Sequence, residues 1–534
     1  MIKELTNFID RLDPEMKALG MKPKEGLHIM LNLQQENGQF LFNEKAIVQT
    51  AHTRKKAQSQ KEIEFLKLCS TLDHLSWSVN TNKCFDLPVK AIHSCSPYCL
   101  AIKQENLTNG EKYKVNNKTK VFDRISSYFR KAGELLEKEE EKQNLKIFEN
   151  ALNSEEKFNK WLSLCPDYAM IKDSEYVIFY LDMPLEKYEA TNAQYLSDKL
   201  FNTNEYNKSI DNEVFGTSDF FNAYPSKKPF LSHKSASFDI AGRITSKEAK
   251  SLYEFADIMS RGILPKPLPI FIHQDEIMKK AGRNIENSAI TIFKREAQKN
   301  EKESRIGYRE IIEELHQKHA DELGNYYLLF YDRGEIKDFD FVPKFEYELK
   351  NGDMKWEIED IFDGGNKHTV RNVFDFQEAV LWQIFSNGLI VKTKAGGYHY
   401  KYFDDIENKY CKSEAVYILI MQYRKIFYDF VYKSKRQAVT ESMFGHIILT
   451  AIVEDIRLDE IKSGYHTEER NIRQKLNIFF SLKENFSQSS HKKKETMANK
   501  LKEHREFIRK LTKGEADIET DDQYAFAAGQ VIYY

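Results

Sequence analysis

Apolar and polar positions follow helix or strand spacing along most of the chain. Residues 1–20 carry apolar side chains at every third or fourth position, a pattern typical of an amphipathic helix. Two short apolar runs then flank Asn37-Gly38, a dipeptide that tolerates the positive φ angles of a tight turn, and together they predict a β-hairpin. A long helical stretch is predicted at 123–162, and the apolar run at 175–183 predicts a buried strand.

The pattern changes from mixed to mainly helical in the second half of the chain. A strand is predicted at 326–332 and a hairpin at 338–352, after which nearly every segment has a helical period. A pair of glycines interrupts the pattern near residue 370 and marks a domain boundary. We therefore predict an α+β protein. Its large mixed N-terminal domain, residues 1–370, contains short antiparallel hairpins, and a mainly helical domain follows at residues 371–534.

Composition narrows the classes of function. The 534 residues include 80 Lys and Arg against 82 Asp and Glu, so the net charge of -2 excludes a uniformly basic nucleic-acid-binding protein and leaves only a local basic surface. The N-terminus lacks the apolar core of a signal peptide, and no apolar run approaches the roughly 20 residues that span a bilayer. Six cysteines in a chain of this length do not form a disulfide framework. We expect a cytoplasmic, reduced protein with no membrane partner.

A group of cysteine and histidine residues raises the question of a zinc site. Structural zinc sites take their ligands in pairs that are typically two to four residues apart, so that one turn presents both to the ion. Cys95 and Cys99 form one such pair, but Cys84 and His93 would have to supply the other ligands and do not form a second pair. The spacing favours small buried thiols and leaves zinc binding open.

An acidic residue followed by Glu-x-Lys gives a second chemical alternative. Asp340 and the later Glu348-Leu349-Lys350 fit the pattern of Mg²⁺-dependent nucleases, in which two carboxylates hold the metal and the lysine assists the attacking water. Strand alternation would place Glu348 and Lys350 on one face, as it does in any half-exposed strand. The chain has no Walker loop, no G-x-S-x-G, no H-E-x-x-H and no G-x-G-x-x-G after a strand. We therefore expect a protein that is not an enzyme, with no catalytic residues, cofactor or metal, and keep the nuclease as the alternative.

The segment 213–255 differs most from the rest of the chain, because aromatic and basic residues are interleaved within it. Aromatic rings stack on unpaired bases, Lys and Arg neutralise phosphates, and an Asn amide can read a base edge. The segment fits a local nucleic-acid surface, although core phenylalanines and solvated lysines would give the same pattern. A smaller basic patch lies on a predicted loop at Arg54, Lys55 and Lys56. The aromatic residues of the segment are Phe215, Phe220, Phe221, Tyr224, Phe230 and Phe238, and the polar ones are Asn222, Lys227, Lys228, His233, Lys234 and Arg243.

Five runs of the sequence carry a family resemblance. The most specific are GTSDFFNAYPSKKPFL (216–231) and RITSKEAKSLYEFADIMSRGILPKPLPIFI (243–272). The others are NKCFDLPVKAIHSCSPYCLAIK (82–103), NYYLLFYDRGEIKDFDFV (325–342) and the closing YAFAAGQVIYY (524–534). Together these runs resemble the large subunit of subtype I-B CRISPR interference complexes (Cascade), in the same order and over most of the chain.

This resemblance implies a non-catalytic subunit of a cytoplasmic ribonucleoprotein complex that serves antiviral defence. Such a subunit contacts the 5′ handle of the guide CRISPR RNA, recognises the short flanking motif (PAM) in target double-stranded DNA, stabilises the R-loop and recruits the helicase-nuclease. Its protein partners are the backbone, handle-end and small subunits of the complex. Family members often continue beyond the position of Tyr534 into a region that resembles the small subunit. The apolar C-terminal helix pattern, which has no capping signal, agrees with such a continuation.

The resemblance and the residue types together indicate where nucleic acid would bind. We expect Asn222 and Lys228 to read base edges or the minor groove next to the target. The basic patch at 54–56 is the second choice for contacts with the flanking duplex DNA. The expected contacts to phosphates or to the RNA handle are Lys227, His233, Lys234 and Arg243.

Overall fold

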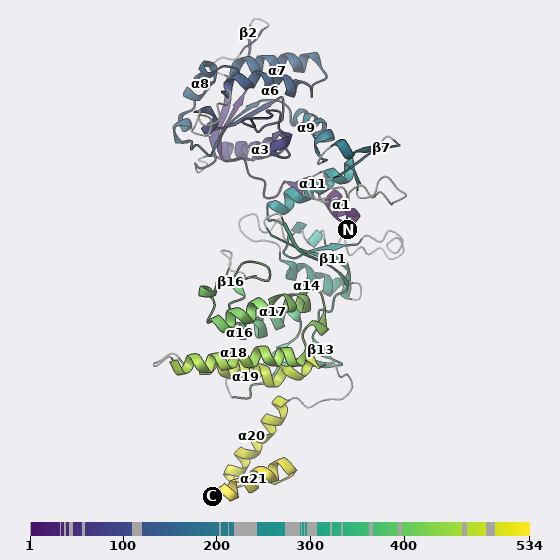
Figure 1. Ribbon diagram of the computed structural model, residues 1–534, viewed down its shortest axis with the longest axis vertical. Helices are drawn as coiled ribbons and strands as arrows, with labels where there is room; N and C mark the ends of the chain where they lie inside the picture. Colours follow the sequence, from purple (N-terminus) through teal and green to yellow (C-terminus); the bar gives the residue numbers. More distant parts are fainter. Residues whose placement is uncertain are drawn as a thin grey trace. The chain divides into compact units, whose positions relative to one another are not determined.

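The structure is a computed structural model in which the chain forms two compact units, Met1–Ile263 and Leu264–Tyr534 (Figure 1). Each unit has its own sheets and its own helices. The structure describes residues 2–32, 34–36, 39–41, 46–55, 59–108, 120–201, 204–211, 213–217, 243–272, 289, 291–292, 294–295, 307–320, 323–332, 335–362, 367–392, 398–461, 467–487 and 497–533.

A four-stranded mixed sheet forms the centre of the first unit, with its strands in the order β4-β1-β6-β5. β1 and β6 are parallel, with Leu27 opposite Val177, whereas the two outer pairs are antiparallel. Every residue of β1 is buried, as expected for a strand that is covered on both faces. The strands are β1 (Gly26–Leu31), β4 (Ile47–His52), β5 (Cys99–Lys103) and β6 (Tyr176–Leu181).

Helices cover both faces of this sheet. Figure 1 shows α6 and α7 on one side of the sheet and α3 on the other. Phe65 and Cys69 of α3 share one buried core with the strands and with Tyr128 and Phe129 of α6. The helices are α3 (Gln60–Ser76), α4 (Gln104–Leu107), α6 (Phe122–Gly133), α7 (Glu139–Leu152), α8 (Glu155–Ser163) and α9 (Leu185–Lys199).

The first predicted helix is broken, and the first predicted hairpin is confirmed. Residues 1–20 form α1 (Ile2–Arg11) and α2 (Pro14–Ala18), because Pro14 has no N–H to continue α1 and Asp13 caps the new helix. The hairpin forms between β2 (Gln34–Glu36) and β3 (Gln39–Leu41) around the Asn-Gly dipeptide.

The stretch 123–162, predicted to be helical throughout, is three helices. Ser154 ends the continuity between α7 and α8, since its hydroxyl accepts a hydrogen bond from the Lys157 N–H at 3.3 Å and so caps α8. The buried strand predicted at 175–183 is confirmed as β6.

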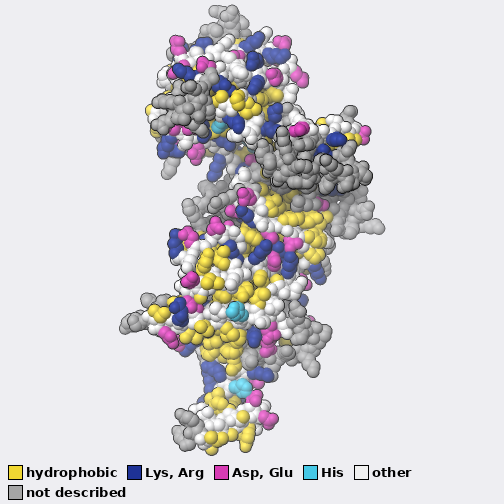
Figure 2. Space-filling view, viewed as in Figure 1, with side chains coloured by type: hydrophobic (Ala, Val, Ile, Leu, Met, Phe, Trp, Pro, Cys, Tyr) yellow, Lys and Arg dark blue, Asp and Glu magenta, His cyan; other side chains and the backbone are white. Residues whose placement is uncertain are grey.

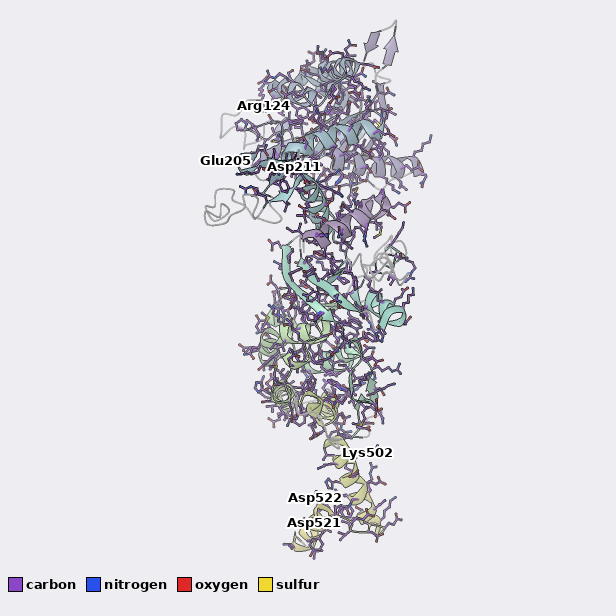
Figure 3. All side chains as sticks on the ribbon, turned by 90° about the vertical axis from the view of Figure 1, so that its right-hand side faces the viewer. Arg124, Glu205, Asp211, Lys502, Asp521 and Asp522 are labelled. Carbon is purple, nitrogen blue, oxygen red and sulfur yellow. The ribbon has the colours of Figure 1, made fainter. Side chains whose placement is uncertain are left out.

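A buried ion pair fixes the loop that leads to β5. Arg124 of α6, labelled in Figure 3, donates to Asp86 with an Nε–Oδ1 distance of 2.5 Å. The second carboxylate oxygen accepts hydrogen bonds from the N–H groups of Ala91 at 2.7 Å and Ile92 at 3.2 Å. Charge-assisted hydrogen bonds of this kind are stronger than neutral ones, so Asp86 orders this loop.

Short antiparallel sheets and a long helical part make up the second unit. β11 lies between β10 and β12, and β14 lies between β13 and β15. Together with the first unit, this arrangement confirms the predicted α+β class, with short antiparallel sheets followed by helices. None of the helices in the described part of the chain combines the length and the apolar character needed to cross a membrane.

The strands of the second unit are β10 (Leu268–Phe271), β11 (Gly324–Asp332), β12 (Glu335–Lys344), β13 (Lys350–Asn351), β14 (Met354–Ile358), β15 (His368–Val370), β16 (Ile390–Lys392) and β17 (Tyr398–Tyr400). Its helices are α14 (Tyr308–His319), α15 (Val373–Phe376), α16 (Trp382–Ile384), α17 (Glu414–Tyr432), α18 (Glu441–Ile461), α19 (Glu469–Leu482), α20 (Met497–Lys513) and α21 (Asp521–Tyr533).

The prediction that residues 338–352 form a hairpin of their own is wrong. β12 pairs with the preceding β11, where Leu328 lies opposite Asp340, and β13 pairs with β14. An alternating pattern defines which side chains share a face of a strand but does not name the neighbouring strand. The shorter connection, from Asp332 to Glu335, decides the pairing.

An aromatic core crosses the boundary that the sequence places near residue 370. Trp356 of β14 packs against Phe376, Phe430 and Phe486, with ring centroids 6.2, 6.4 and 5.2 Å away. The division of the chain into compact units falls at 263/264 instead, because β14 and the C-terminal helices share this core. Gly364-Gly365 lies outside the described residues, and the described elements before and after it, β14 and β15, belong to one unit.

Candidate nucleic-acid interface

The segment expected to bind nucleic acid starts and ends at neighbouring strands of the first unit. β8 (Glu213–Gly216) lies between β7 (Lys208–Ile210) and β9 (Ile244–Thr245) in a small antiparallel sheet. Gly216 is paired with Ile244 at the end of the β8–β9 ladder. The described chain therefore stops at Thr217 and resumes at Arg243, next to this pair, and residues 218–242 lie outside the described residues. Binding residues are commonly carried on such connections, held by a rigid scaffold.

The scaffold under this connection is closely packed at β8. A Cβ atom added to Gly216 would lie 2.4 Å from Asn207 Oδ1 and 2.5 Å from the ring of Phe201. Phe201 and Thr217 are both buried. Only glycine fits at position 216 without moving these neighbours, so the start of the connection is fixed by packing.

The return of the connection is fixed by a capped helix, α11 (Ser246–Ser260). Thr245 Oγ1 accepts from the Glu248 N–H at 3.1 Å, and Glu248 Oε2 accepts from the Thr245 N–H at 2.9 Å, which is a capping box. α11 lies against α1, where Ser251 donates to Asp10 at 2.8 Å and Phe255 meets Phe8 edge-on.

We expect Thr245→Ala to lower the free energy of unfolding of the first unit by about 1 kcal/mol, because the hydroxyl that caps α11 is lost. Thr245→Ser keeps the hydroxyl and should stay close to the wild type. Chemical denaturation followed by circular dichroism measures both. Equal stability of the alanine and serine variants would contradict the role of the cap.

Most of the residues expected to contact nucleic acid lie in that connection. Arg243 is described and sits half-buried directly before β9. The others lie outside the described residues, and their assignment stays a prediction; they are Asn222, Lys227, Lys228, His233 and Lys234.

The second-choice patch is tied to carboxylates. Arg54 Nε lies 2.5 Å from an oxygen of Glu175, whose side chain is fully buried, and Lys55 Nζ lies 3.1 Å from Asp167. Lys56 lies outside the described residues. On the face shown in Figure 2, too, Lys and Arg side chains lie among Asp and Glu. A phosphate at this patch would compete with carboxylates that already neutralise both described cations.

The cysteine and histidine group is split between different surroundings. Cys84 and Cys95 belong to a small buried cluster, whereas Cys99 belongs to the main core. The His93 ring is bonded to the Tyr176 hydroxyl at 2.6 Å and to the Lys90 carbonyl at 3.1 Å. Burial raises the pKa of Cys95 to about 12 and also raises the pKa of Cys84, as expected for thiols enclosed by apolar side chains. The described residues contain no group of three or more Cys, His, Asp or Glu side chains that could hold a metal.

The residues of the nuclease alternative do not converge. Asp340 on β12 lies 2.5 Å from Lys435 Nζ and 3.3 Å from Lys433 Nζ. Burial raises the pKa of Asp340, but the hydrogen bond from Lys435 and the nearby charges outweigh it and hold the pKa below its ordinary value. Glu348 pairs instead with Lys350 at 2.9 Å on an exposed surface. Lys433 also pairs with Asp338 at 2.7 Å and Asp429 at 2.8 Å, so the arrangement around Asp340 is an ion cluster in which a lysine ammonium lies among the carboxylates.

A pocket in the second unit contains residues that the sequence analysis did not single out. It has a volume of about 360 Å³, and its walls include Trp382, Tyr410 and Asn471. These residues come from three separate segments, so no local motif could have brought them together. Polar and aromatic side chains of these kinds occur at many other positions, so their residue types did not distinguish them in the sequence.

No protein-family model matches the chain, and neither a curated protein nor a solved structure matches it.

Proposed function

We propose that this protein is the non-catalytic large subunit of a type I-B Cascade RNA-guided surveillance complex. In this role it recognises the PAM in target double-stranded DNA, contacts the 5′ handle of the guide RNA, stabilises the R-loop and recruits the helicase-nuclease. Base pairing by the guide reads the target sequence, so the protein needs to read only the short flank and the backbone.

The observation that supports this proposal most is the placement of the segment with the most specific resemblance. Residues 218–242 carry Asn, Lys and aromatic side chains, and the β8–β9 pairing holds both ends of this connection together. A tethered connection with this composition can present base-reading and phosphate-binding groups in one place. The capping of α11 and the packing at Gly216 keep its two ends in position.

We expect Asn222→Ala to weaken binding of the assembled complex to its preferred flank by about 1–3 kcal/mol and to relax flank specificity, as loss of a base-edge contact does. The measurement is the Kd of the guide complex for a set of duplexes that differ only in the flank. Asn150→Ala, at an exposed position on α7, is the matched control and should leave every Kd unchanged.

Lys227→Ala separates a phosphate contact from a base contact. Loss of this side chain should weaken binding to all flanks alike. It should also reduce the slope of log K against log salt concentration by about one unit. If complexes with Asn222→Ala assemble and discriminate flanks as the wild type does, the assignment of flank reading to this segment fails.

A further inference from the structure

The pocket in the second unit has the size of a small-ligand site and a mostly polar lining. Its volume of about 360 Å³ lies in the range of roughly 300–1,000 Å³ that is usual for such sites. One wall is the end of α16 and the turn after it, and a second wall is the segment around Tyr410. Asn471 reaches the pocket from α19. Aromatic, amide and lysine side chains meet there.

The turn after α16 holds an uncommon backbone conformation. Ser386 and Asn387 are consecutive and have φ angles of 46° and 62°, a region that L residues other than glycine rarely occupy. The Asn387 N–H donates to the Trp382 carbonyl at 2.9 Å, which holds the turn closed. Conformations of this kind cluster at functional sites, where the surrounding structure maintains them.

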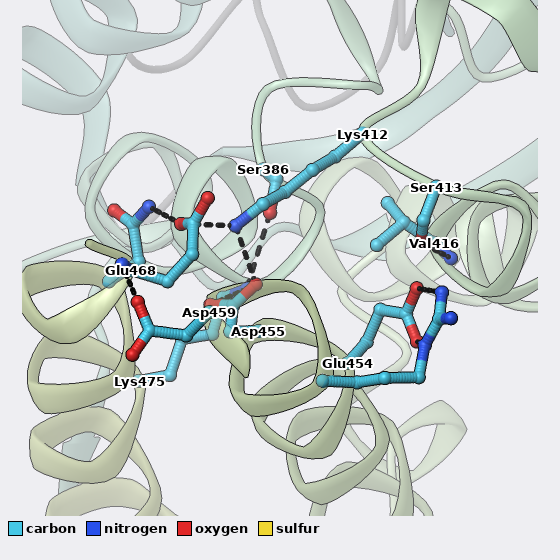
Figure 4. Close-up of polar contacts among 11 residues, drawn as sticks. Ser386, Lys412, Ser413, Val416, Glu454, Asp455, Asp459, Glu468 and Lys475 are labelled. Atoms are coloured by element: carbon cyan, nitrogen blue, oxygen red, sulfur yellow. Dashed lines mark hydrogen bonds and ion pairs between the residues drawn. The ribbon is translucent and has the colours of Figure 1, made fainter. Parts of the chain in front are cut away.

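A balanced network of charges lies beside this wall (Figure 4). Lys412 Nζ lies 2.7 Å from Asp455 and 2.6 Å from Glu468. Lys475 Nζ lies 2.7 Å from the second oxygen of Asp455 and donates to Ser386 Oγ at 3.2 Å. Two ammonium groups thus face two carboxylates, so these four charges balance one another. The Asp459 carboxylate, also drawn in Figure 4, accepts from the Glu468 N–H instead.

The recognition groups of the pocket are its amides and its aromatic rings. The side-chain amides of Gln383 and Asn387 make no hydrogen bond with another described residue, so both are available to a ligand. Trp382 is held in place, because its Nε1–H donates to the Tyr400 hydroxyl at 2.9 Å. Tyr410 lines the pocket with 67% of its surface exposed.

A lysine, Lys409, also lines the pocket. Lys409 Nζ lies 4.9 Å from the centre of the Tyr410 ring and 2.6 Å from Glu407. Both members of this ion pair are exposed, and exposed pairs of this type contribute little and exchange easily. Lys409 is therefore able to turn from Glu407 to a phosphate while Tyr410 stacks on the attached base.

We propose that this pocket binds one unpaired nucleotide, with its base stacked on Tyr410, its base edge hydrogen-bonded to Gln383 and Asn387, and its phosphate beside Lys409. Aromatic stacking together with amide contacts to a base edge is how proteins bind splayed bases of single strands. The nucleotide is either part of a single strand or a free mononucleotide. If the nucleotide belongs to a single strand, the proposal rests on the proposed function. In neither case does it depend on flank reading by residues 218–242.

The test uses the purified full chain without the guide complex. A short labelled oligothymidylate, the same length of abasic oligonucleotide, and the mononucleotides AMP and UMP are titrated separately. Tyr410→Ala should weaken oligothymidylate binding about tenfold, which is within the range for losing one stacking ring. Tyr410→Phe keeps the ring and should bind as the wild type does. The matched control is Tyr524→Ala, because Tyr524 on α21 is 65% exposed.

Photocrosslinking locates the base. An oligonucleotide that contains 5-iodouracil should crosslink to Tyr410, as identified by mass spectrometry of the digested chain. Binding of oligothymidylate but not of AMP or UMP assigns the site to a strand, whereas binding of the mononucleotides assigns it to free nucleotides. Equal binding of the abasic oligonucleotide, no binding of any probe, or an unaltered affinity of Tyr410→Ala would each overturn the proposal. Because flank discrimination by Asn222→Ala complexes is measured separately, failure here is distinguishable from failure of the proposed function.

Discussion

Replacing Gly26 by alanine is expected to lower the free energy of unfolding of the first unit by about 4 kcal/mol, since backbone strain and a steric clash act together. Gly26 has a φ angle of 148° and is the first residue of the parallel β1–β6 pair, opposite Tyr176. A Cβ atom there would lie 1.9 Å from the Tyr176 carbonyl oxygen. A backbone atom inside a sheet cannot turn away as a side chain can, so β1 and β6 would have to separate at this end.

Gly262→Ala is the matched control for this prediction. Gly262 also has a positive φ angle, 69°, but a Cβ atom there would meet nothing within 4 Å. Gly262→Ala should therefore lower the free energy of unfolding by only about 1 kcal/mol, the cost of placing alanine in a left-handed backbone conformation. Chemical denaturation gives the two free energies, and hydrogen exchange of the β6 amides shows where the loss occurs. Equal midpoints for both variants would contradict the steric explanation.

Lys475→Met is expected to lower the free energy of unfolding of the second unit by about 3 kcal/mol, because it leaves Asp455 buried with a partner removed. The side chains of Lys475 and Asp455 are both fully buried. Burial lowers the pKa of Lys475, and the hydrogen bond and charge of Asp455 oppose this shift. The loss should be at the low end of the range for buried pairs, since Lys412 still lies 2.7 Å from Asp455.

Two further variants separate charge imbalance from loss of volume. Lys475→Met combined with Asp455→Asn leaves Lys412 facing Glu468, so this double variant should be more stable than Lys475→Met alone. Arg473→Ala removes an ion pair with Glu469 in which both side chains are exposed, and should cost below about 1 kcal/mol. Thermal and chemical denaturation of the three variants give the comparison. A Lys475→Met variant no less stable than Arg473→Ala would refute the role of the buried pair.

Local patterns in the sequence predicted local structure well. The Asn-Gly turn gave the β2–β3 hairpin, and helical periodicity gave α17 and α18, since both signals depend on neighbours along the chain. The partner of β12 was not predictable in this way, because alternation leaves the neighbouring strand open. The break before Pro14 was readable from the proline, but the regular spacing of apolar residues across it favoured one helix.

For the candidate sites, too, the sequence indicated local features but not the contacts between distant segments. Composition alone singled out 213–255, and the structure adds that the two ends of its central connection are joined by β8 and β9. Glu-x-Lys spacing predicted a shared strand face for Glu348 and Lys350 but could not show that Asp340 pairs with lysines from beyond α17. The nucleotide pocket depends on tertiary packing of distant segments, for which a single sequence holds no direct signal.

The hydrogen bonds between β8 and β9 hold the two ends of the connection together, so a change in its length has only a small entropic cost. The entropy of loop closure depends only weakly on length, and doubling the number of residues costs about 0.6 kcal/mol. On loop-closure entropy alone, a change in the number of residues between Thr217 and Arg243 therefore alters the folding free energy of the first unit only slightly. Under the proposed function, residues that read the flank can therefore be added to or removed from this segment at little entropic cost to folding.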